Sequence, residues 1–420
     1  MPAASEVLVL KAKALDDVTN GDVMAPAYVR VEGDRITEVS SVGGSIERDA
    51  RVIDLPELTL LPGLMDMELN LVLGGPGASK FDSVQDDPAE RLLRAVVNCR
   101  TTLRAGFTTV RNLGLFIPTG GLLLDAALAR AVDSGWIDGP RIVPAGHAIT
   151  PTGGHLDPTM FQALAPGIMP LTVEEGVADG VDQIRKAVRY QIKHGAKVIK
   201  CCASGGVMSH TGEAGAQQYS FEELKVIADE AHRAGLKAAA HAHGESGIRA
   251  AIEAGIDCIE HGSLMSDDTI QMMVDRGTFL VATTYLADGM DVSRAAPALQ
   301  AKAAIVFPMA KATISRAIAA GVKIACGTDA PAIPHGKNAK ELEALVDRGM
   351  TPLQAIQAAT LVSADLIDVD DRARIQPGLL ADIIGVPGDP LTDIKVTQSV
   401  AFVMKGGKVY KGNGELAGLR

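Results

Sequence analysis

The sequence has no lysine or arginine cluster to offset its acidic background. With a formal net charge of −11 and an isoelectric point near 5.3, it offers nothing to attract a nucleic acid or an anionic membrane surface. Its beginning also lacks the basic segment and long apolar run of a signal peptide or membrane anchor. We therefore expect a cytoplasmic protein with a small-molecule substrate and with no nucleic-acid or membrane partner.

The sequence also lacks a CxxC pair. Its five cysteines are scattered through apolar runs, and this odd number favours reduced, buried thiols over a disulfide framework. Cys201 and Cys202 are adjacent in a predicted strand, so their side chains would point to opposite faces. This argues against a zinc-thiolate site. The cysteines are Cys99, Cys201, Cys202, Cys258 and Cys326.

No repeat of fixed period is present, but short β-rich runs alternate with longer helical stretches such as Phe221–Ala234 and Ser246–Ala254. This alternation is typical of βα units around a parallel sheet, and eight runs predict a closed (β/α)₈ barrel, or TIM barrel. A chain of 420 residues with 47% hydrophobic side chains can bury such a core. The eight runs are Leu61–Leu71, Phe107–Leu113, Arg141–Ala145, Lys197–Cys202, Leu236–Ala242, Cys258–His261, Thr278–Thr284 and Lys323–Thr328.

The two ends of the chain show a different pattern. Glu6–Asp54 and Gly378–Tyr410 contain short alternating strands with turn residues and no matching helices. We expect residues 1–60 and 373–420 to form one small β-sandwich domain, and residues 61–372 to form the barrel. The predicted fold class is therefore α/β, with a composite β-domain built from both ends.

Four ionisable residues end apolar runs of the predicted barrel: Lys200, His241, His261 and Asp329. Catalytic residues of such barrels lie at the C-terminal ends of the strands. Each residue alone has an ordinary explanation, such as a salt bridge for Lys200 or a helix N-cap for Asp329. Together, two imidazoles, a carboxylate and a lysine at one barrel mouth form a ligand set for a divalent metal ion.

Several further motifs span nearly the whole chain. Because of these motifs, the chain resembles the amidohydrolase superfamily. The resemblance is strongest to its Xaa-Pro dipeptidases, its N-acyl amino acid hydrolases and the related amidases that act on foreign compounds. The motifs are LPGLMDM (Leu61–Met67), AGFTTVRNLG (Ala105–Gly114), IKCCASGGVMS (Ile199–Ser209), QYSFEEL (Gln218–Leu224), AAHAHG (Ala239–Gly244), IEHG (Ile259–Gly262), GTDA (Gly327–Ala330), TPLQAIQAAT (Thr351–Thr360) and PGLLADIIGVPGDPL (Pro377–Leu391).

The resemblance implies that Lys200 is carboxylated by CO₂ and bridges two metal ions, and that His241 and His261 hold one of them. It implies that Asp329 is both ligand and general base. A carbamate would supply the oxygen ligands that an ammonium lacks, and a metal lowers the pKa of its water from about 15.7 to near 7. The expected metal is zinc, one or two ions per chain, with Mn, Co or Fe as other candidates. The resemblance also implies a homo-oligomer, with an octamer as one candidate.

The end of the first strand departs from the family's pattern. Where the family carries His-X-His, this chain has Glu68, Leu69 and Asn70. Glu68 and Asn70 alternate onto one face of the strand and offer oxygen ligands, so Glu68, carboxylated Lys200 and Asp329 could hold a harder ion such as Mn²⁺ or Mg²⁺. Alternatively, that position is empty and a single metal lies at Lys200, His241 and His261.

Six further residues lie in predicted strand-to-helix loops, where a substrate would be held. His155 and Tyr219 fall in stretches that are similar to the family's site loops. Ser204 belongs to a Ser-Gly-Gly turn whose backbone N–H groups could bind a carboxylate or a carbonyl. Each residue could instead make a hydrogen bond that only holds its loop. The six are His155, Ser204, His210, Tyr219, His243 and His335.

We therefore predict metal-dependent hydrolysis of an amide bond in an N-acyl amino acid or dipeptide-like substrate, including bulky aryl amides of the ochratoxin type. The altered first motif leaves a phenylurea or carbamate hydrolase as the alternative. A second alternative is a metal-poor barrel that binds a ligand without turnover, or one inactivated by engineered changes at Glu68 and Asn70.

Overall fold

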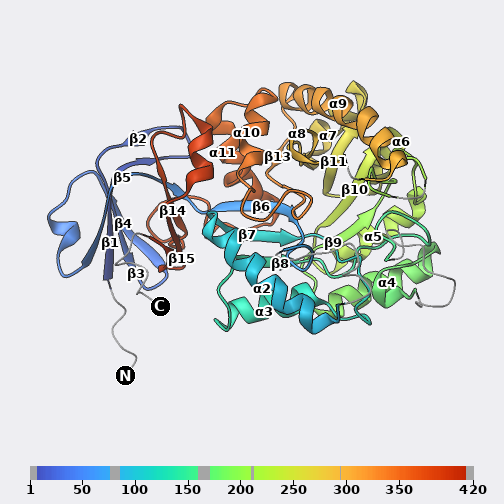
Figure 1. Ribbon diagram of the computed structural model, residues 1–420, viewed down its shortest axis with the longest axis horizontal. Coiled ribbons are helices and arrows are strands. Elements are labelled where there is room, and N and C mark those ends of the chain that lie inside the picture. The colour runs from blue at the N-terminus through green and yellow to red at the C-terminus, as the bar shows by residue number, and fades with distance from the viewer. Residues whose placement is uncertain (1–6, 76–85, 159–170, 210–211, 294, 413–420) are drawn as a thin grey trace.

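The computed structural model describes residues 7–75, 86–158, 171–209, 212–293 and 295–412. Eight buried strands of its larger part lie parallel to their neighbours in two hydrogen-bonded groups, ordered β6-β7-β8 and β13-β12-β11-β10-β9 (Figure 1). Each predicted run overlaps one of them. The strands are β6 (Leu64–Leu69), β7 (Phe107–Asn112), β8 (Arg141–Pro144), β9 (Ile199–Cys202), β10 (Ala238–Gly244), β11 (Cys258–Leu264), β12 (Phe279–Val281) and β13 (Ile324–Ala325).

Backbone hydrogen bonds join the two groups into a closed barrel. On one side, the N–H of Met67 in β6 donates to the carbonyl of Cys326, just after β13, at 2.7 Å. On the other side, the N–H of Ile149, beyond β8, donates to the carbonyl of Lys200 in β9 at 2.8 Å. The predicted (β/α)₈ barrel is confirmed.

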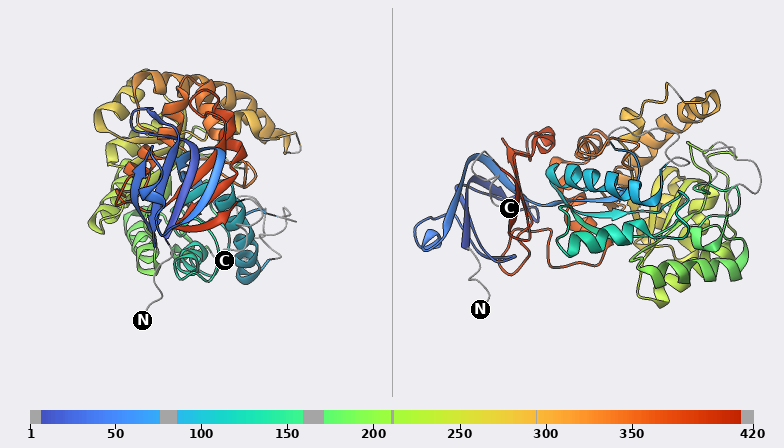
Figure 2. Two further views of the ribbon diagram at one scale, coloured as in Figure 1. Left: turned by 90° about the vertical axis from the view of Figure 1, so that its left-hand side faces the viewer. Right: turned by 60° about the horizontal axis from the view of Figure 1, so that its bottom comes forward.

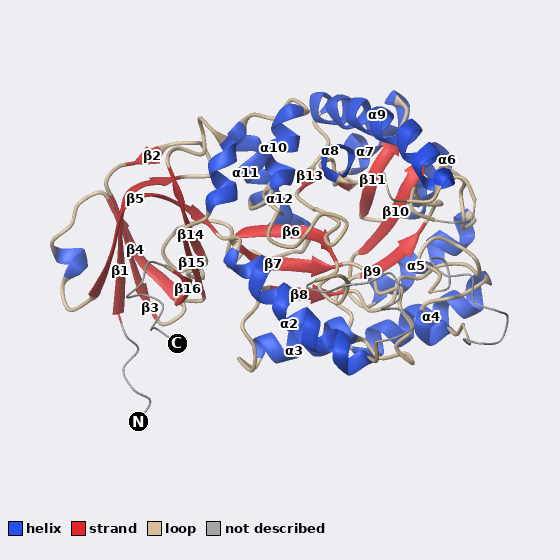
Figure 3. Ribbon diagram, viewed as in Figure 1, coloured by secondary structure: helices blue, strands red, loops and turns tan. Residues whose placement is uncertain are grey.

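Helices surround the barrel (Figure 3). Helix α5 shows why they begin where they do, because Ser220 and Glu223 form a capping box in which each side chain accepts from the other's backbone N–H. Its buried residues include Leu224 and Ile227. The helices are α2 (Pro88–Arg104), α3 (Leu124–Asp133), α4 (Gly180–His194), α5 (Phe221–Arg233), α6 (Glu245–Ala254), α7 (Asp267–Arg276), α8 (Leu286–Gly289), α9 (Pro297–Ala320), α10 (Lys340–Asp347), α11 (Pro352–Ala358) and α12 (Leu361–Leu366), with 3₁₀ turns η1 (Ser45–Glu47), η2 (Val173–Glu175) and η3 (Ile394–Ser399).

Both ends of the chain contribute to one further sheet, which lies to one side of the barrel (Figure 2). Antiparallel pairing of β5 with β14 joins the two ends, as predicted. Residues from both ends, including Leu10, Ile53 and Phe402, share one apolar core, as in a sandwich. The predicted boundaries at residues 60 and 373 stay predictions. The strands are β1 (Val7–Asp16), β2 (Val23–Met24), β3 (Ala27–Glu32), β4 (Arg35–Ser40), β5 (Arg51–Pro62), β14 (Ile383–Pro387), β15 (Phe402–Lys405) and β16 (Lys408–Lys411).

Helix α9 is long and apolar enough, by length and composition, to cross a membrane. It packs against β11, α7 and α8 in this structure, and residues such as Leu299 and Ile314 are buried. A single helix of this kind is weak evidence for a membrane span. The expected absence of a membrane partner stays a prediction. All five cysteines are buried and free, as expected.

Candidate metal centre and active site

A cavity of about 230 Å³ lies where the C-terminal ends of the barrel strands meet. All six residues that the sequence suggested as metal ligands line it, although they lie on five different strands or on the segments that follow them. Their convergence follows from the parallel barrel, which brings the carboxyl ends of all its strands to one face. The six are Glu68, Asn70, Lys200, His241, His261 and Asp329.

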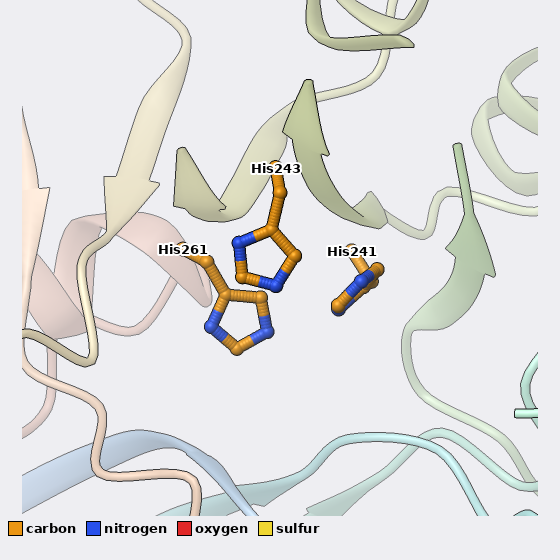
Figure 4. A group of neighbouring side chains, drawn as sticks. All are labelled: His241, His243 and His261. Carbon is orange, nitrogen blue, oxygen red and sulfur yellow. The ribbon is translucent and has the colours of Figure 1, made fainter. Parts of the chain in front are cut away.

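Three buried histidines form the centre of this cavity. His241 and His243 lie on β10, two residues apart and hence on one face of the strand, and His261 lies on β11. One ring nitrogen from each can be chosen so that all three lie within 4.8 Å of one another. Figure 4 shows the three rings facing one another. Three imidazoles gathered in one cavity form a candidate ligand group for a divalent ion such as zinc.

Hydroxyl groups on neighbouring segments orient two of these rings. Nδ1 of His243 lies 2.8 Å from the Ser263 hydroxyl, and Nδ1 of His261 lies 2.7 Å from the Thr283 hydroxyl. When each Nδ1–H donates to its hydroxyl, Nε2 keeps the lone pair that a metal needs. Burial lowers the pKa of His261 to about 3, and it also lowers the pKa of His241 and His243 well below the usual value. All three rings are therefore neutral near pH 7, the form that binds metals.

The Lys200 ammonium pairs with the Glu68 carboxylate inside the cavity. Lys200 Nζ lies 3.1 Å from Glu68 Oε1, and both side chains are buried. The same Glu68 oxygen lies 3.6 Å from Nε2 of His261. The other oxygen, Oε2, is buried and has no hydrogen-bond partner among the described residues. Glu68 thus links the end of β6 to both β9 and β11 and keeps one acceptor atom unused.

Asp329 faces the cavity from a strained turn after β13. Its φ of 56° lies in the left-handed region, and its N–H donates to the carbonyl of Glu68 at 2.7 Å. Asp66 fixes the same turn by accepting hydrogen bonds from Thr328 and Asn338. Burial, with a contribution from the Glu68 carboxylate, raises the pKa of Asp329 well above its usual value. A raised pKa suits a carboxylate that accepts a proton.

Asn70 lines the cavity, but backbone groups use both ends of its amide. Its oxygen accepts from the N–H of Val72 at 3.1 Å, and its nitrogen donates to the carbonyl of Gly114 at 3.0 Å. These bonds give Asn70 a structural task at the end of β6. Its predicted role as a metal ligand stays a prediction.

Of the six residues expected to contact a substrate, His155 and His243 line the cavity. His155 packs on His241 with ring centroids 3.9 Å apart, and its Nδ1 lies 2.6 Å from the Ser209 hydroxyl. Their contact with a substrate stays a prediction. His210 lies outside the described residues.

The other three are not among the residues that line this cavity, and their contact with a substrate stays a prediction. The Tyr219 hydroxyl is buried and donates to the Ala178 carbonyl at 2.8 Å. The Ser204 hydroxyl accepts from the N–H of His243, also at 2.8 Å, and so positions β10. His335 Nδ1 lies 3.3 Å from the Thr102 hydroxyl. In each residue at least one polar atom is hydrogen-bonded to another part of the fold.

Sequence reasoning missed a buried ion pair inside the barrel. Arg111 on β7 and Glu260 on β11 lie 2.8 Å apart and are almost fully enclosed. Arg111 Nε also donates to the carbonyl of Met67 at 2.6 Å, which fixes β6 just before Glu68. A charged residue in the middle of an apolar strand, as in TTVRN and CIEH, was the available signal.

The apolar wall of the cavity also escaped sequence analysis. Many of its side chains come from loops and helices far apart in the chain, so no local pattern brings them together. Their number makes the wall of the cavity largely apolar. They include Leu73, Phe116, Leu156, Val207, Met208, Leu286, Met290, Phe307 and Pro331.

Comparison with known proteins agrees with this architecture. A family model described as "Amidohydrolase family" matches residues 59–410. Ochratoxinase of Aspergillus niger is 36% identical over 383 residues, which cover 84% of this chain and 76% of that protein. The crystal structure of that ochratoxinase superposes with a TM-score of 0.84, covering 98% of this chain and 97% of the other at 32% identity. A Xaa-Pro dipeptidase with bound methionine in its active site gives a TM-score of 0.90 at 33% identity, covering 97% of this chain and all of the other.

Proposed function

The chain belongs to the amidohydrolase family, and on that premise we propose that it hydrolyses an amide bond of a small molecule with the help of a divalent metal ion. The observation that carries this proposal is the group of three buried histidines in the cavity at the ends of the barrel strands. Neutral imidazoles that face one another in a cavity form a good ligand set for zinc and for related divalent ions.

We assign the following roles within this proposal. His241 and His261 hold the metal ion, and the third ligand is either Lys200 as a carbamate, as the resemblance implies, or His243. A divalent ion here would polarise the amide carbonyl and lower the pKa of a bound water. Asp329 accepts the proton of the attacking water, because its carboxylate lines the same cavity and its pKa is raised by burial.

The expected substrate is an N-acyl amino acid or a dipeptide-like amide that carries a bulky apolar or aryl group. Two observations support this. The cavity wall is largely apolar, which favours such a group. The similar proteins are named an ochratoxinase and a Xaa-Pro dipeptidase. We include ochratoxin-type aryl amides among the candidates.

Metal removal followed by a substrate panel tests the proposal. The purified protein is stripped with a chelator and assayed on N-acyl amino acids, dipeptides, aryl amides and phenylureas, before and after Zn²⁺, Mn²⁺ or Co²⁺ is returned. We expect amide hydrolysis that is lost with the metal and restored by at least one ion. Turnover of phenylureas alone would favour the urea hydrolase instead. Full activity in the stripped protein would refute metal dependence.

A further inference from the structure

The contact between Lys200 and Glu68 bears on the chemical state of the lysine. Carboxylation of the ammonium would form a bond between Lys200 Nζ and the carbon of CO₂ and release two protons, which converts a cation into an anion. In this chain that new anion would stand beside Glu68, whose Oε1 lies 3.1 Å from Nζ. Two buried carboxylates in contact repel each other unless cations separate them. As an ammonium, Lys200 instead neutralises Glu68.

The end of β6 also offers little to a second metal ion that could offset such an anion. The Asn70 amide is engaged at both ends by the backbone of Val72 and Gly114. Glu68 Oε1 is paired with Lys200. A second ion bridged by a carbamate would therefore have carboxylate oxygens of Glu68 and Asp329 beside it but no imidazole from the end of β6.

His243 supplies what a single ion needs in place of the carbamate. Its ring is stacked on that of His261 with centroids 4.8 Å apart, and its centroid lies 4.8 Å from that of His241. Ser263 orients His243 as Thr283 orients His261, with a hydroxyl on Nδ1 in both cases. Metal-binding imidazoles almost always donate their other ring N–H to a fixed acceptor, and each of these hydroxyls offers one.

Glu68 gives an independent indication that a cation belongs here. Glu68 lines the cavity, and its buried Oε2 has no hydrogen-bond partner in the part of the chain that the structure describes, which is costly for a carboxylate. Nε2 of His261 and Oε1 of Glu68 are 3.6 Å apart. The carboxylate that neutralises Lys200 therefore also lies beside one of the three rings.

We infer that His241, His243 and His261 together hold one divalent ion, while Lys200 remains an uncarboxylated ammonium paired with Glu68. The inference rests on the proposed function, since it specifies the ligands of the proposed metal ion. It assigns His243 to the metal rather than to the substrate. It also gives Glu68 two tasks, because its carboxylate neutralises Lys200 and faces the ion.

The state of Lys200 is read directly on the unmodified protein. Zinc-loaded protein is equilibrated with ¹³C-bicarbonate, and its ¹³C spectrum is recorded together with that of the Glu68→Gln/Lys200→Met variant. A carbamate on Lys200 would give a protein-bound carbonyl resonance that the variant lacks. We expect identical spectra. A resonance that is present only in the unmodified protein would overturn the inference.

Zinc titration of metal-free protein tests the ligand set. His243→Ala should weaken Zn²⁺ binding by more than about 100-fold, because loss of a mere hydrogen-bond partner of a ligand already costs about 10- to 100-fold. Glu68→Gln/Lys200→Met replaces the ion pair by neutral groups and should still bind one Zn²⁺ per chain. His194→Ala, at an exposed histidine in α4, serves as the matched control.

The outcomes separate this inference from the proposed function. If His243→Ala binds Zn²⁺ as tightly as the unmodified protein, or the double variant binds none while remaining folded by circular dichroism, the carbamate assignment replaces ours and metal-dependent hydrolysis stands. If the unmodified protein itself binds no divalent ion, both the ligand set and the metal-dependent reaction are wrong.

Discussion

The end of β6 and the ends of β10 and β11 occupy equivalent places in the barrel, yet their side chains differ in what remains available. On β10 and β11, the hydroxyls on Nδ1 leave Nε2 of His243 and His261 with a lone pair for a metal ion. At the end of β6, the Glu68 carboxylate is paired with Lys200 of β9, and the Asn70 amide is hydrogen-bonded to the backbone. The barrel determines where a side chain points, whereas its neighbours determine which donor atoms are left for a ligand.

The largest effect is expected from removing an imidazole of β10 or β11, where ring nitrogens remain available to bind a metal ion. His261→Ala should abolish both tight Zn²⁺ binding and amide hydrolysis, since two imidazoles alone hold zinc poorly. Metal analysis after gel filtration and the rate on the best amide of the panel measure this. His194→Ala should retain both properties. If the His261→Ala variant keeps its metal content, His261 is not a metal ligand.

Asp329→Asn should leave the metal bound and lower kcat by about 10²- to 10⁴-fold, because the amide cannot accept the proton of the attacking water. A protonated carboxyl cannot accept it either, so the rate of the unmodified enzyme should fall as the pH is lowered through the pKa of this group. The pH–rate profile of the variant should lack that acid limb. A variant with the unmodified kcat and profile would show that another group is the base.

A smaller effect is expected from the hydroxyl that orients His243. Ser263→Ala should weaken Zn²⁺ binding by about 10- to 100-fold without unfolding the protein, because the ring loses its partner on Nδ1. Ser399→Ala, at an exposed serine of η3, is the control. Equal zinc affinities in the two variants would mean that His243 binds no metal.

The double variant Glu68→His/Asn70→His should change binding of the first metal ion least. It gives the end of β6 the His-X-His motif that the resemblance led us to expect. The variant should keep the first ion and gain a second, so that bound metal rises from one towards two per chain. Freed of Glu68, Lys200 should then show the ¹³C-bicarbonate resonance. Either single substitution should gain less. If bound metal stays at one ion per chain, residues other than Glu68 and Asn70 also prevent a second ion from binding at the end of β6.

Residues far apart in the chain explain both the success and the limits of prediction from sequence. The eight barrel strands were predictable because each is a local apolar run, and the barrel then brought Lys200, His241, His261 and Asp329 to one cavity. The partners of those residues were not predictable in the same way. Tyr219 resembled a site residue, but its hydroxyl donates to Ala178, 41 positions earlier.

The ion pair of Arg111 and Glu260 spans an even longer separation of 149 positions. Each of these contacts depends on how strands and loops meet in three dimensions. A single sequence indicates which residues end a strand, but it does not indicate which of their atoms are already bonded to another part of the chain.

The pairing of β5 with β14 has a consequence for how the chain is made. Thr59 and Gly388, which share a hydrogen bond across this junction, are separated by 329 positions. During synthesis the edge of β5 therefore emerges long before the strand that covers it. An open strand edge is a site of aggregation. The nascent chain must carry this edge uncovered until nearly all of the barrel has left the ribosome, so slow translation of the last strands should lower the yield of folded protein.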